Sequence, residues 1–120
     1  MAKFDVTSLK LDDRGLIPAI VQDFSTGEVL MMAWMNKDAI LQTLESGTAT
    51  FWSRSRQCIW VKGLTSGNTQ KLEEIRIDCD RDCLLLLVTP NGPACHTNRR
   101  HCFYTEIQNG HEKILIKPET

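Results

Sequence analysis

The order of apolar and polar residues in this chain predicts strands joined by tight turns, with one short helix. Apolar runs over 16–22 and 29–35 flank a Ser-Thr-Gly turn and are expected to pair as a hairpin. Apolar residues then recur at helical spacing over 37–45. Asn36 suits the N-cap of this helix, and Gly47 suits a left-handed C-terminal cap.

The second half of the chain is predicted to be β-structure. Four strands are expected from runs of β-branched and aromatic residues, over 49–53, 59–62, 103–108 and 113–116. The stretch 71–89 alternates at first and then becomes continuously apolar, which is typical of a strand passing from a half-exposed to a buried position. Asn109-Gly110, between the last two strands, favours a type I′ turn. The expected fold class is α+β, with a mostly antiparallel sheet or barrel-like β domain and one short helix.

Composition and charge narrow the functional classes. The 120 residues suit one domain, 1–120, and the hydrophobic fraction of 42% is that of an ordinary globular protein. A net charge of −1 argues against a protein that binds nucleic acid or a membrane by electrostatics alone. Neither a signal-peptide pattern nor a run of 18 apolar residues occurs, so a cytoplasmic protein is expected.

The segment DCDRDC is the first candidate site. If it continues a strand, Asp78, Asp80 and Asp82 share one face, about 6.6 Å apart at each step, and Cys79 lies on the other face. Carboxylates in this arrangement suit a hard cation such as Mg²⁺. A solvated acidic edge that prevents strand pairing is the alternative.

The five cysteines are the second candidate. An odd number in a reducing compartment favours free thiols, which serve as zinc ligands, as nucleophiles or as small buried side chains. Cys95 and Cys102 flank HTNRRH, and both can bind one zinc ion only if that segment doubles back, which Asn98 favours by tolerating a left-handed backbone. Three thiolates would leave a fourth position open for water, as in catalytic zinc sites. His96 could then transfer protons, with His101 as the alternative.

Between Gly15 and Tyr104 the chain resembles the phosphoribosyl-AMP cyclohydrolases of histidine biosynthesis. The matching motifs are GLIPAIVQD, TGEVLMMAWMN, ATFWSRSR, WVKGLTSGN, DCDRD and GPACHT, in this order and followed by CFY. The resemblance implies hydrolysis of the adenine N1–C6 bond of 1-(5-phosphoribosyl)-AMP by a zinc- and magnesium-dependent homodimer. Asn98 and His101 depart from the family pattern, which usually has glycine and a small polar residue there.

The resemblance also implies roles for individual residues. It makes Asp78, Asp80 and Asp82 magnesium ligands. It makes Cys79 a zinc ligand that joins the partner subunit's Cys95 and the partner subunit's Cys102 in one site shared between the two chains.

The substrate carries two phosphate-bearing arms, which need positive charges or backbone amides. Arg54, Arg56 and Lys62 are the candidate charges, and Ser66, Gly67 and Asn68 are the candidate backbone nest. Each of these residues could instead be an exposed turn or strand residue.

Two other functions are alternatives to a cyclohydrolase. A zinc deaminase would need HxE followed by PCxxC, and this chain has neither motif. A non-catalytic zinc-stabilised binding module would usually carry paired CxxC units and would leave the aspartates unexplained.

Overall fold

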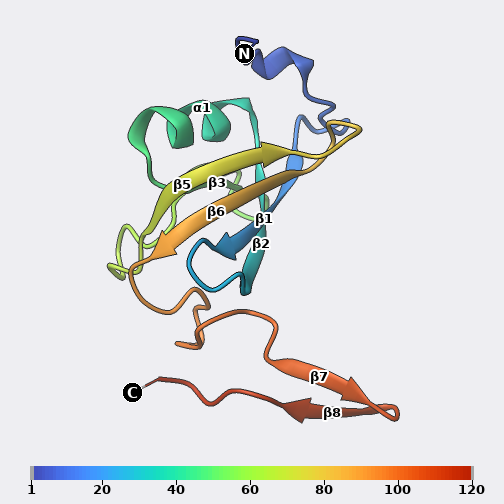
Figure 1. The fold of residues 1–120 in the computed structure, drawn as a ribbon, viewed down its shortest axis with the longest axis vertical. Helices are drawn as coiled ribbons and strands as arrows, with labels where there is room; N and C mark the ends of the chain where they lie inside the picture. The colour runs from blue at the N-terminus through green and yellow to red at the C-terminus, as the bar shows by residue number, and fades with distance from the viewer. Residues whose placement is uncertain (1, 120) are drawn as a thin grey trace.

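The computed structural model describes residues 2–119 as a curled six-stranded sheet, one α-helix and a separate two-stranded ribbon (Figure 1). A short 3-10 helix, η1 (Val6–Ser8), precedes them. The sheet contains β1 (Ile17–Asp23), β2 (Val29–Met35), β3 (Thr50–Ser53), β4 (Cys58–Val61), β5 (Gln70–Ile77) and β6 (Leu84–Pro90). The helix is α1 (Lys37–Ser46), and the ribbon consists of β7 (Thr105–Gln108) and β8 (His111–Ile114).

The sheet has the order β4-β3-β2-β1-β6-β5 and is mostly antiparallel, as predicted. One neighbouring pair, β1 and β6, is parallel, with Ala19 beside Leu84. The end of the sheet at β5 also bonds to the segment that leads into β3. Ala49 N–H donates to the Gln70 carbonyl at 2.9 Å, and Leu72 N–H donates to the Gly47 carbonyl at 2.8 Å. These bonds curl the sheet into a half-barrel.

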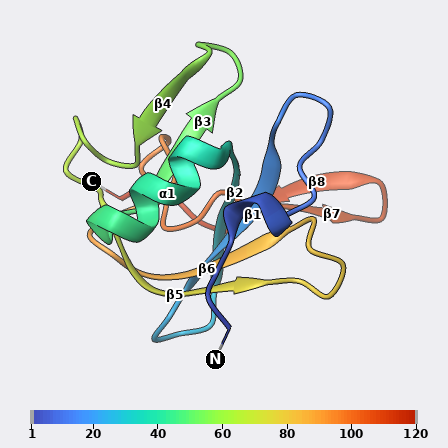
Figure 2. The same ribbon diagram turned by 90° about the horizontal axis from the view of Figure 1, so that it is seen from above.

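The core lies between the inner face of the sheet and α1, which crosses the strands when the molecule is seen from above (Figure 2). Along β1, alternate residues from Ile17 to Val21 are buried, because successive strand residues face opposite sides of the sheet. The predicted helix caps are confirmed. Asn36 accepts a hydrogen bond from Ala39 N–H at 2.8 Å, and Gly47 is left-handed with φ of 73°.

The prediction of one strand across 71–89 is wrong. The chain reverses, and β5 and β6 form an antiparallel hairpin in which Ile77 pairs with Leu84. The side chain of Asp78 makes the turn, because its Oδ1 accepts the N–H groups of Asp82 at 2.9 Å and Cys83 at 3.0 Å. Arg81 completes it in the left-handed region, with φ of 65°.

The C-terminal hairpin is present, although β7 begins two residues later than predicted and β8 lies two residues earlier in the chain than predicted. Asn109 and Gly110 have φ of 49° and 79°, as a type I′ turn requires. The ribbon of β7 and β8 stands apart from the six-stranded sheet (Figure 1). Within residues 2–119, no helix combines the length and the apolar character that crossing a membrane would require.

Candidate functional site

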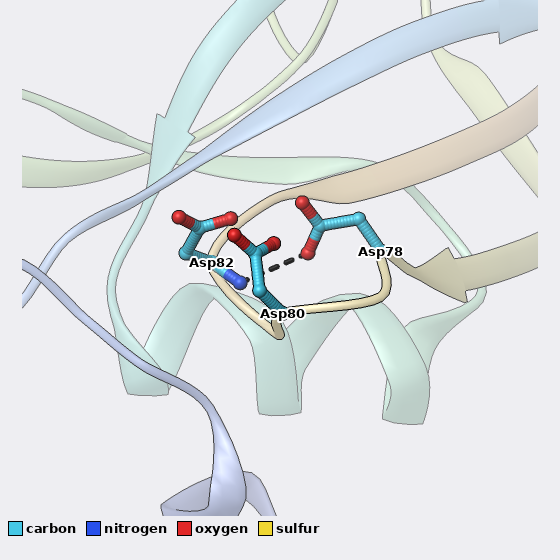
Figure 3. A group of neighbouring side chains, drawn as sticks. All are labelled: Asp78, Asp80 and Asp82. Atoms are coloured by element: carbon cyan, nitrogen blue, oxygen red, sulfur yellow. Dashed lines mark hydrogen bonds between the residues drawn. The ribbon is translucent and has the colours of Figure 1, made fainter.

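Three aspartates meet in the loop between β5 and β6, which we call the acidic loop (Asp78–Cys83). One carboxylate oxygen from each of Asp78, Asp80 and Asp82 lies within 4.8 Å of the others, and no other group of three or more candidate ligands forms within residues 2–119. Figure 3 shows the three side chains on the same side of the loop. The hairpin turn brings them together, not the strand alternation that was expected.

The carboxylates of the acidic loop shift one another's pKa values. Hydrogen bonds from protonated Asp82 to Asp80 and Asp78, together with the charges of those two groups, raise the pKa of Asp82 to about 6. For Asp78, loss of solvent favours a higher pKa, but hydrogen bonds to Asp82, Asp80 and the backbone outweigh it and lower the pKa. One proton is therefore shared among carboxylates that a divalent cation could neutralise instead.

The segment 94–102, which we call the cysteine loop, doubles back. This reversal is required if Cys95 and Cys102 are to bind the same zinc ion. Ala94 N–H donates to the Arg100 carbonyl at 3.2 Å, and Cys95 N–H donates to the Arg99 carbonyl at 3.1 Å. Asn98 lies at the bend with φ of 64°. The two ends of HTNRRH are thereby brought together.

The thiols of Cys95 and Cys102 interact with each other. Burial, followed by the proximity of Cys95, raises the pKa of Cys102 to about 11. Burial also favours a higher pKa for Cys95, but hydrogen bonds to Thr97 and Cys102 and the charge of Lys62 outweigh it and lower the pKa. Both thiols can ionise readily only with a cation between them, so this pair suits zinc.

Cys79 is not part of this thiol pair within one chain. It belongs to the acidic loop, at the tip of the β5–β6 hairpin, whereas the cysteine loop lies beyond the opposite end of β6 (Figure 1). A single chain therefore offers two thiols at one location and the third at another.

A large pocket of about 830 Å³ lies between β4, the following loop and the cysteine loop. It brings together most of the predicted substrate-binding and catalytic residues, which are Arg56, Lys62, Ser66, Asn68 and His96, with the predicted zinc ligand Cys95. The other predicted residues, Arg54 and Gly67, do not line it. Arg54 instead stacks 4.8 Å above the Trp34 ring and lines a pocket of about 250 Å³ with Arg14.

Lys62 connects β4 to the cysteine loop. Its ammonium donates to the Ala94 carbonyl at 2.5 Å and lies 5.8 Å from the centre of the Trp60 ring. Burial lowers the pKa of Lys62, and the nearby thiols of Cys102 and Cys95 act in the opposite direction. Lys62 can thus hold the loop while presenting positive charge to the pocket.

The loop 63–69 contributes to the pocket through a close approach of two backbone segments. A Cβ on Gly63 would lie 2.1 Å from the Asn68 carbonyl carbon, and a Cβ on Gly92 would lie 2.3 Å from Asn68 Oδ1. Two of the three amides proposed as a phosphate nest already donate hydrogen bonds within the loop. Gly67 N–H donates to Gly63 O at 2.8 Å, and Asn68 N–H donates to Ser66 Oγ at 3.2 Å.

The two histidines of the cysteine loop have different surroundings. His96 lines the large pocket. His101 is turned toward Glu28, with its Nε2 3.6 Å from Glu28 Oε2, and its Nδ1 accepts the Phe103 N–H at 3.1 Å. The geometry therefore favours His96 as the residue that can reach a substrate.

Comparison with known proteins assigns the chain to a family. A family model described as phosphoribosyl-AMP cyclohydrolase matches residues 31–104. A protein of that name from Paracoccus denitrificans is 66% identical over 97% of this chain and 96% of its own length. Relatives of the same name from Cereibacter sphaeroides (strain KD131) and Jannaschia sp. are 64% and 60% identical, over 96% and 99% of this chain and 97% and 100% of their own lengths. The chain belongs to the phosphoribosyl-AMP cyclohydrolase family. The resemblance drawn from its motifs is confirmed, as is the prediction of an enzyme of this type.

Some residues of this candidate site could not be predicted from the sequence. Thr97 Oγ1 lies 3.0 Å from Cys95 Sγ, and Glu28 contacts both Arg100 and His101. Glu28 is far from the cysteine loop along the chain, and nothing in the sequence around Glu28 indicates that its carboxylate contacts this loop. Thr97 is separated from Cys95 by one residue. This spacing is too common in turns to show from the sequence that the threonine hydroxyl contacts the thiol.

Proposed function

We propose that this chain hydrolyses the adenine N1–C6 bond of 1-(5-phosphoribosyl)-AMP in histidine biosynthesis, as a zinc- and magnesium-dependent homodimer. The single observation that carries the proposal is the large pocket, which places His96 beside Cys95 and lines the same space with Arg56 and Lys62. The pocket therefore combines a proton carrier, a candidate metal ligand and positive charges for a phosphorylated substrate.

The thiols support zinc as one of the two metals. Cys95 and Cys102 perturb each other's ionisation and face the charge of Lys62, so that a cation is needed before both become thiolates. Cys79 would complete the site from the partner subunit. A bound zinc ion would supply Lewis-acid activation of the attacking water.

The residues of the chain would then act on the substrate as follows. Water adds at C6, the N1–C6 bond breaks, and N1 receives a proton. His96 is proposed to carry that proton, since it faces the pocket next to Cys95. Arg56 and Lys62 would bind phosphate oxygens, while Ser66 would contribute its hydroxyl.

Magnesium is proposed to bind the acidic loop. The three carboxylates already lie within 4.8 Å of one another, where like charges repel, and hydrogen bonds from protonated Asp82 to Asp80 and Asp78 raise the pKa of Asp82. A hard cation with oxygen ligands would remove that repulsion. This loop also carries Cys79, so binding of magnesium would order the segment that supplies the third thiol.

The outer face of the sheet supports a homodimer. Ile20 and Met32 are paired across β1 and β2 and are 38% and 46% exposed, although both are apolar. Leu85 of β6 lies beside Ile20 in the parallel pair. Apolar residues on neighbouring strands of one exposed face are typical of a surface that another protein covers.

The proposal is tested by following the loss of 1-(5-phosphoribosyl)-AMP by ultraviolet absorbance, with zinc measured by elemental analysis. Wild-type protein is expected to open the ring and to hold about one zinc per chain, the stoichiometry of one tetrahedral site per subunit. Cys102→Ala should lose both, while Cys58→Ala, which removes an exposed thiol on β4, should lose neither. A wild-type protein that holds zinc but leaves the substrate intact would favour the non-catalytic binding module.

A further inference from the structure

Glu28 contacts the cysteine loop from the turn that precedes β2. Its Oε1 forms an ion pair with Arg100 Nε, and its Oε2 lies 3.6 Å from His101 Nε2. Arg100 and His101 directly precede Cys102. Cys102 is also bonded to β2, because its N–H donates to the Leu30 carbonyl at 2.7 Å. One side of the cysteine loop is therefore attached to Glu28 and Leu30.

The backbone of Glu28 is well fixed. Asp23 N–H donates to the Glu28 carbonyl at 2.8 Å, and Glu28 N–H donates to Thr26 Oγ1 at 3.1 Å. Asp23 Oδ1 accepts the Ser25 N–H at 2.8 Å, which closes the same turn. Because the turn is fixed by these hydrogen bonds, the Glu28 carboxylate has a fixed position from which it can hold Arg100 and His101.

The orientation of His101 is determined by its two ring nitrogens. Because Nδ1 accepts the Phe103 N–H at 3.1 Å, the ring proton lies on Nε2 and faces the Glu28 carboxylate. The side chain is 13% exposed, so the ring is packed as well as bonded. His101 thus acts as a connection between Glu28 and the backbone on both sides of Cys102.

The other side of the cysteine loop is held independently. Lys62 bonds to the Ala94 carbonyl, and Thr97 contacts the Cys95 thiol. The separation of the two thiols therefore depends on Lys62 on one side, and on Glu28 and the Leu30 bond on the other. Loss of the Glu28 contacts would leave the Leu30 bond as the link between Cys102 and β2, so the Cys102 thiol would be held less firmly while Cys95 keeps its own contacts.

We propose that Glu28 is a positioning residue that holds Cys102 in place for zinc through Arg100 and His101. The proposal rests on the zinc site of the proposed function. Hydrogen-bonded groups outside the ligand shell typically contribute 10- to 100-fold to metal affinity. Glu28→Gln should weaken zinc binding by about that factor, because the neutral amide no longer pairs with the Arg100 guanidinium.

The first experiment measures zinc affinity by competition with a chromogenic chelator, together with the kinetics of ring opening. Glu28→Gln should raise the zinc dissociation constant about 10-fold or more, and at limiting zinc should lower kcat with KM for the substrate within about 2-fold. Glu112→Gln, on the exposed strand β8, is the matched control and should match the wild type. Wild-type zinc affinity and kcat in Glu28→Gln would overturn the proposal.

The second experiment uses metal-free protein, so that its outcome is independent of zinc. Alkylation of Cys102 by iodoacetamide, followed by peptide mass spectrometry, should be several-fold faster in Glu28→Gln, while alkylation of Cys95 changes little. Combining Glu28→Gln with Arg100→Gln should add little further effect, because both substitutions break one contact. Unchanged Cys102 alkylation would contradict the role of Glu28. A wild-type protein with no zinc would instead contradict the zinc site, and the alkylation rates would still decide on Glu28.

Discussion

At the scale of single residues, neighbouring groups of like chemistry share protons. In the acidic loop, hydrogen bonds from protonated Asp82 to Asp80 and Asp78 raise the pKa of Asp82 to about 6, and in the thiol pair burial, followed by the charge of Cys95, raises the pKa of Cys102 to about 11. Both perturbations would be relieved by a cation. The two histidines of the cysteine loop show a second effect of position, because His96 faces the pocket and His101 faces Glu28.

Binding of magnesium to the acidic loop should depend on pH. Because Asp82 is protonated below pH of about 6, a proton competes with the cation there, and the affinity should fall by up to about tenfold for each further unit of acidification. Titration calorimetry with Mg²⁺ at pH 7.5, 6 and 5 would measure this. Asp82→Asn should bind more weakly at pH 7.5 and show a much flatter pH dependence; an equally steep dependence in that variant would exclude Asp82 as the competing group.

Replacement of His96 should slow the chemical step more than substrate binding. His96→Asn keeps a polar side chain but removes the imidazole that is proposed to carry the proton, so kcat should fall by about 10²- to 10⁴-fold while KM changes little. Steady-state ultraviolet kinetics measure both constants. His111→Asn on the exposed strand β8 is the control, and it should retain wild-type kcat. If His96→Asn keeps more than about a third of the wild-type kcat, the proton-transfer role fails.

At the scale of elements, the loop after β4 determines the shape of the pocket. Gly63 has φ of 77°, and its backbone lies so close to Asn68 that no side chain fits. Asn91 bonds across to the same loop, since its Nδ2 donates to the Gly67 carbonyl at 3.0 Å. The loop is therefore held between β4 and the end of β6, and its position controls Ser66 in the pocket.

Substitution of Gly63 should test this close approach. In Gly63→Ala the new Cβ would meet the Asn68 backbone at 2.1 Å, so the loop must move. Gly27→Ala is a matched control, because its φ of 78° is similar but its Cβ meets nothing within 4 Å. We expect a loss of about 1 kcal/mol in the free energy of unfolding for the control from backbone strain alone, and about 3 kcal/mol for Gly63→Ala with a raised KM. Urea unfolding with equal losses in both variants would contradict the close approach.

The elements that could be predicted from the sequence are those whose chemistry is local. The Asn36 cap and the Asn109-Gly110 turn follow from the preferences of their own residues. The reversal in DCDRDC could not be predicted in this way, because it contains no glycine or proline and is made by the Asp78 side chain. The candidate site shows the same division. The bend of the cysteine loop could be predicted from Asn98, whereas the contact of Glu28 with Arg100 could not, because it joins distant parts of the chain.

At the scale of the whole molecule, the two sets of candidate metal ligands lie at opposite ends of β6. The acidic loop with Cys79 precedes this strand, and the cysteine loop follows it. One chain cannot gather the three thiols without a large rearrangement of the sheet. A second copy covering the exposed face at Ile20 and Met32 would allow each acidic loop to approach the other chain's cysteine loop.

Mixing two inactive variants would decide whether the zinc site is shared. Cys79→Ala and Cys102→Ala should each be inactive alone, since each removes a ligand from both sites of a symmetric homodimer. In a mixed dimer, one site loses both ligands and the other keeps all three. If the two variants are unfolded together, refolded and mixed at random, half of the dimers are mixed and activity should return to about a quarter of the wild-type value. A single-chain site predicts no recovery, because every chain in the mixture still lacks one thiol. Mixing Cys95→Ala with Cys102→Ala is the matched control, since these ligands come from the same chain and no combination restores them.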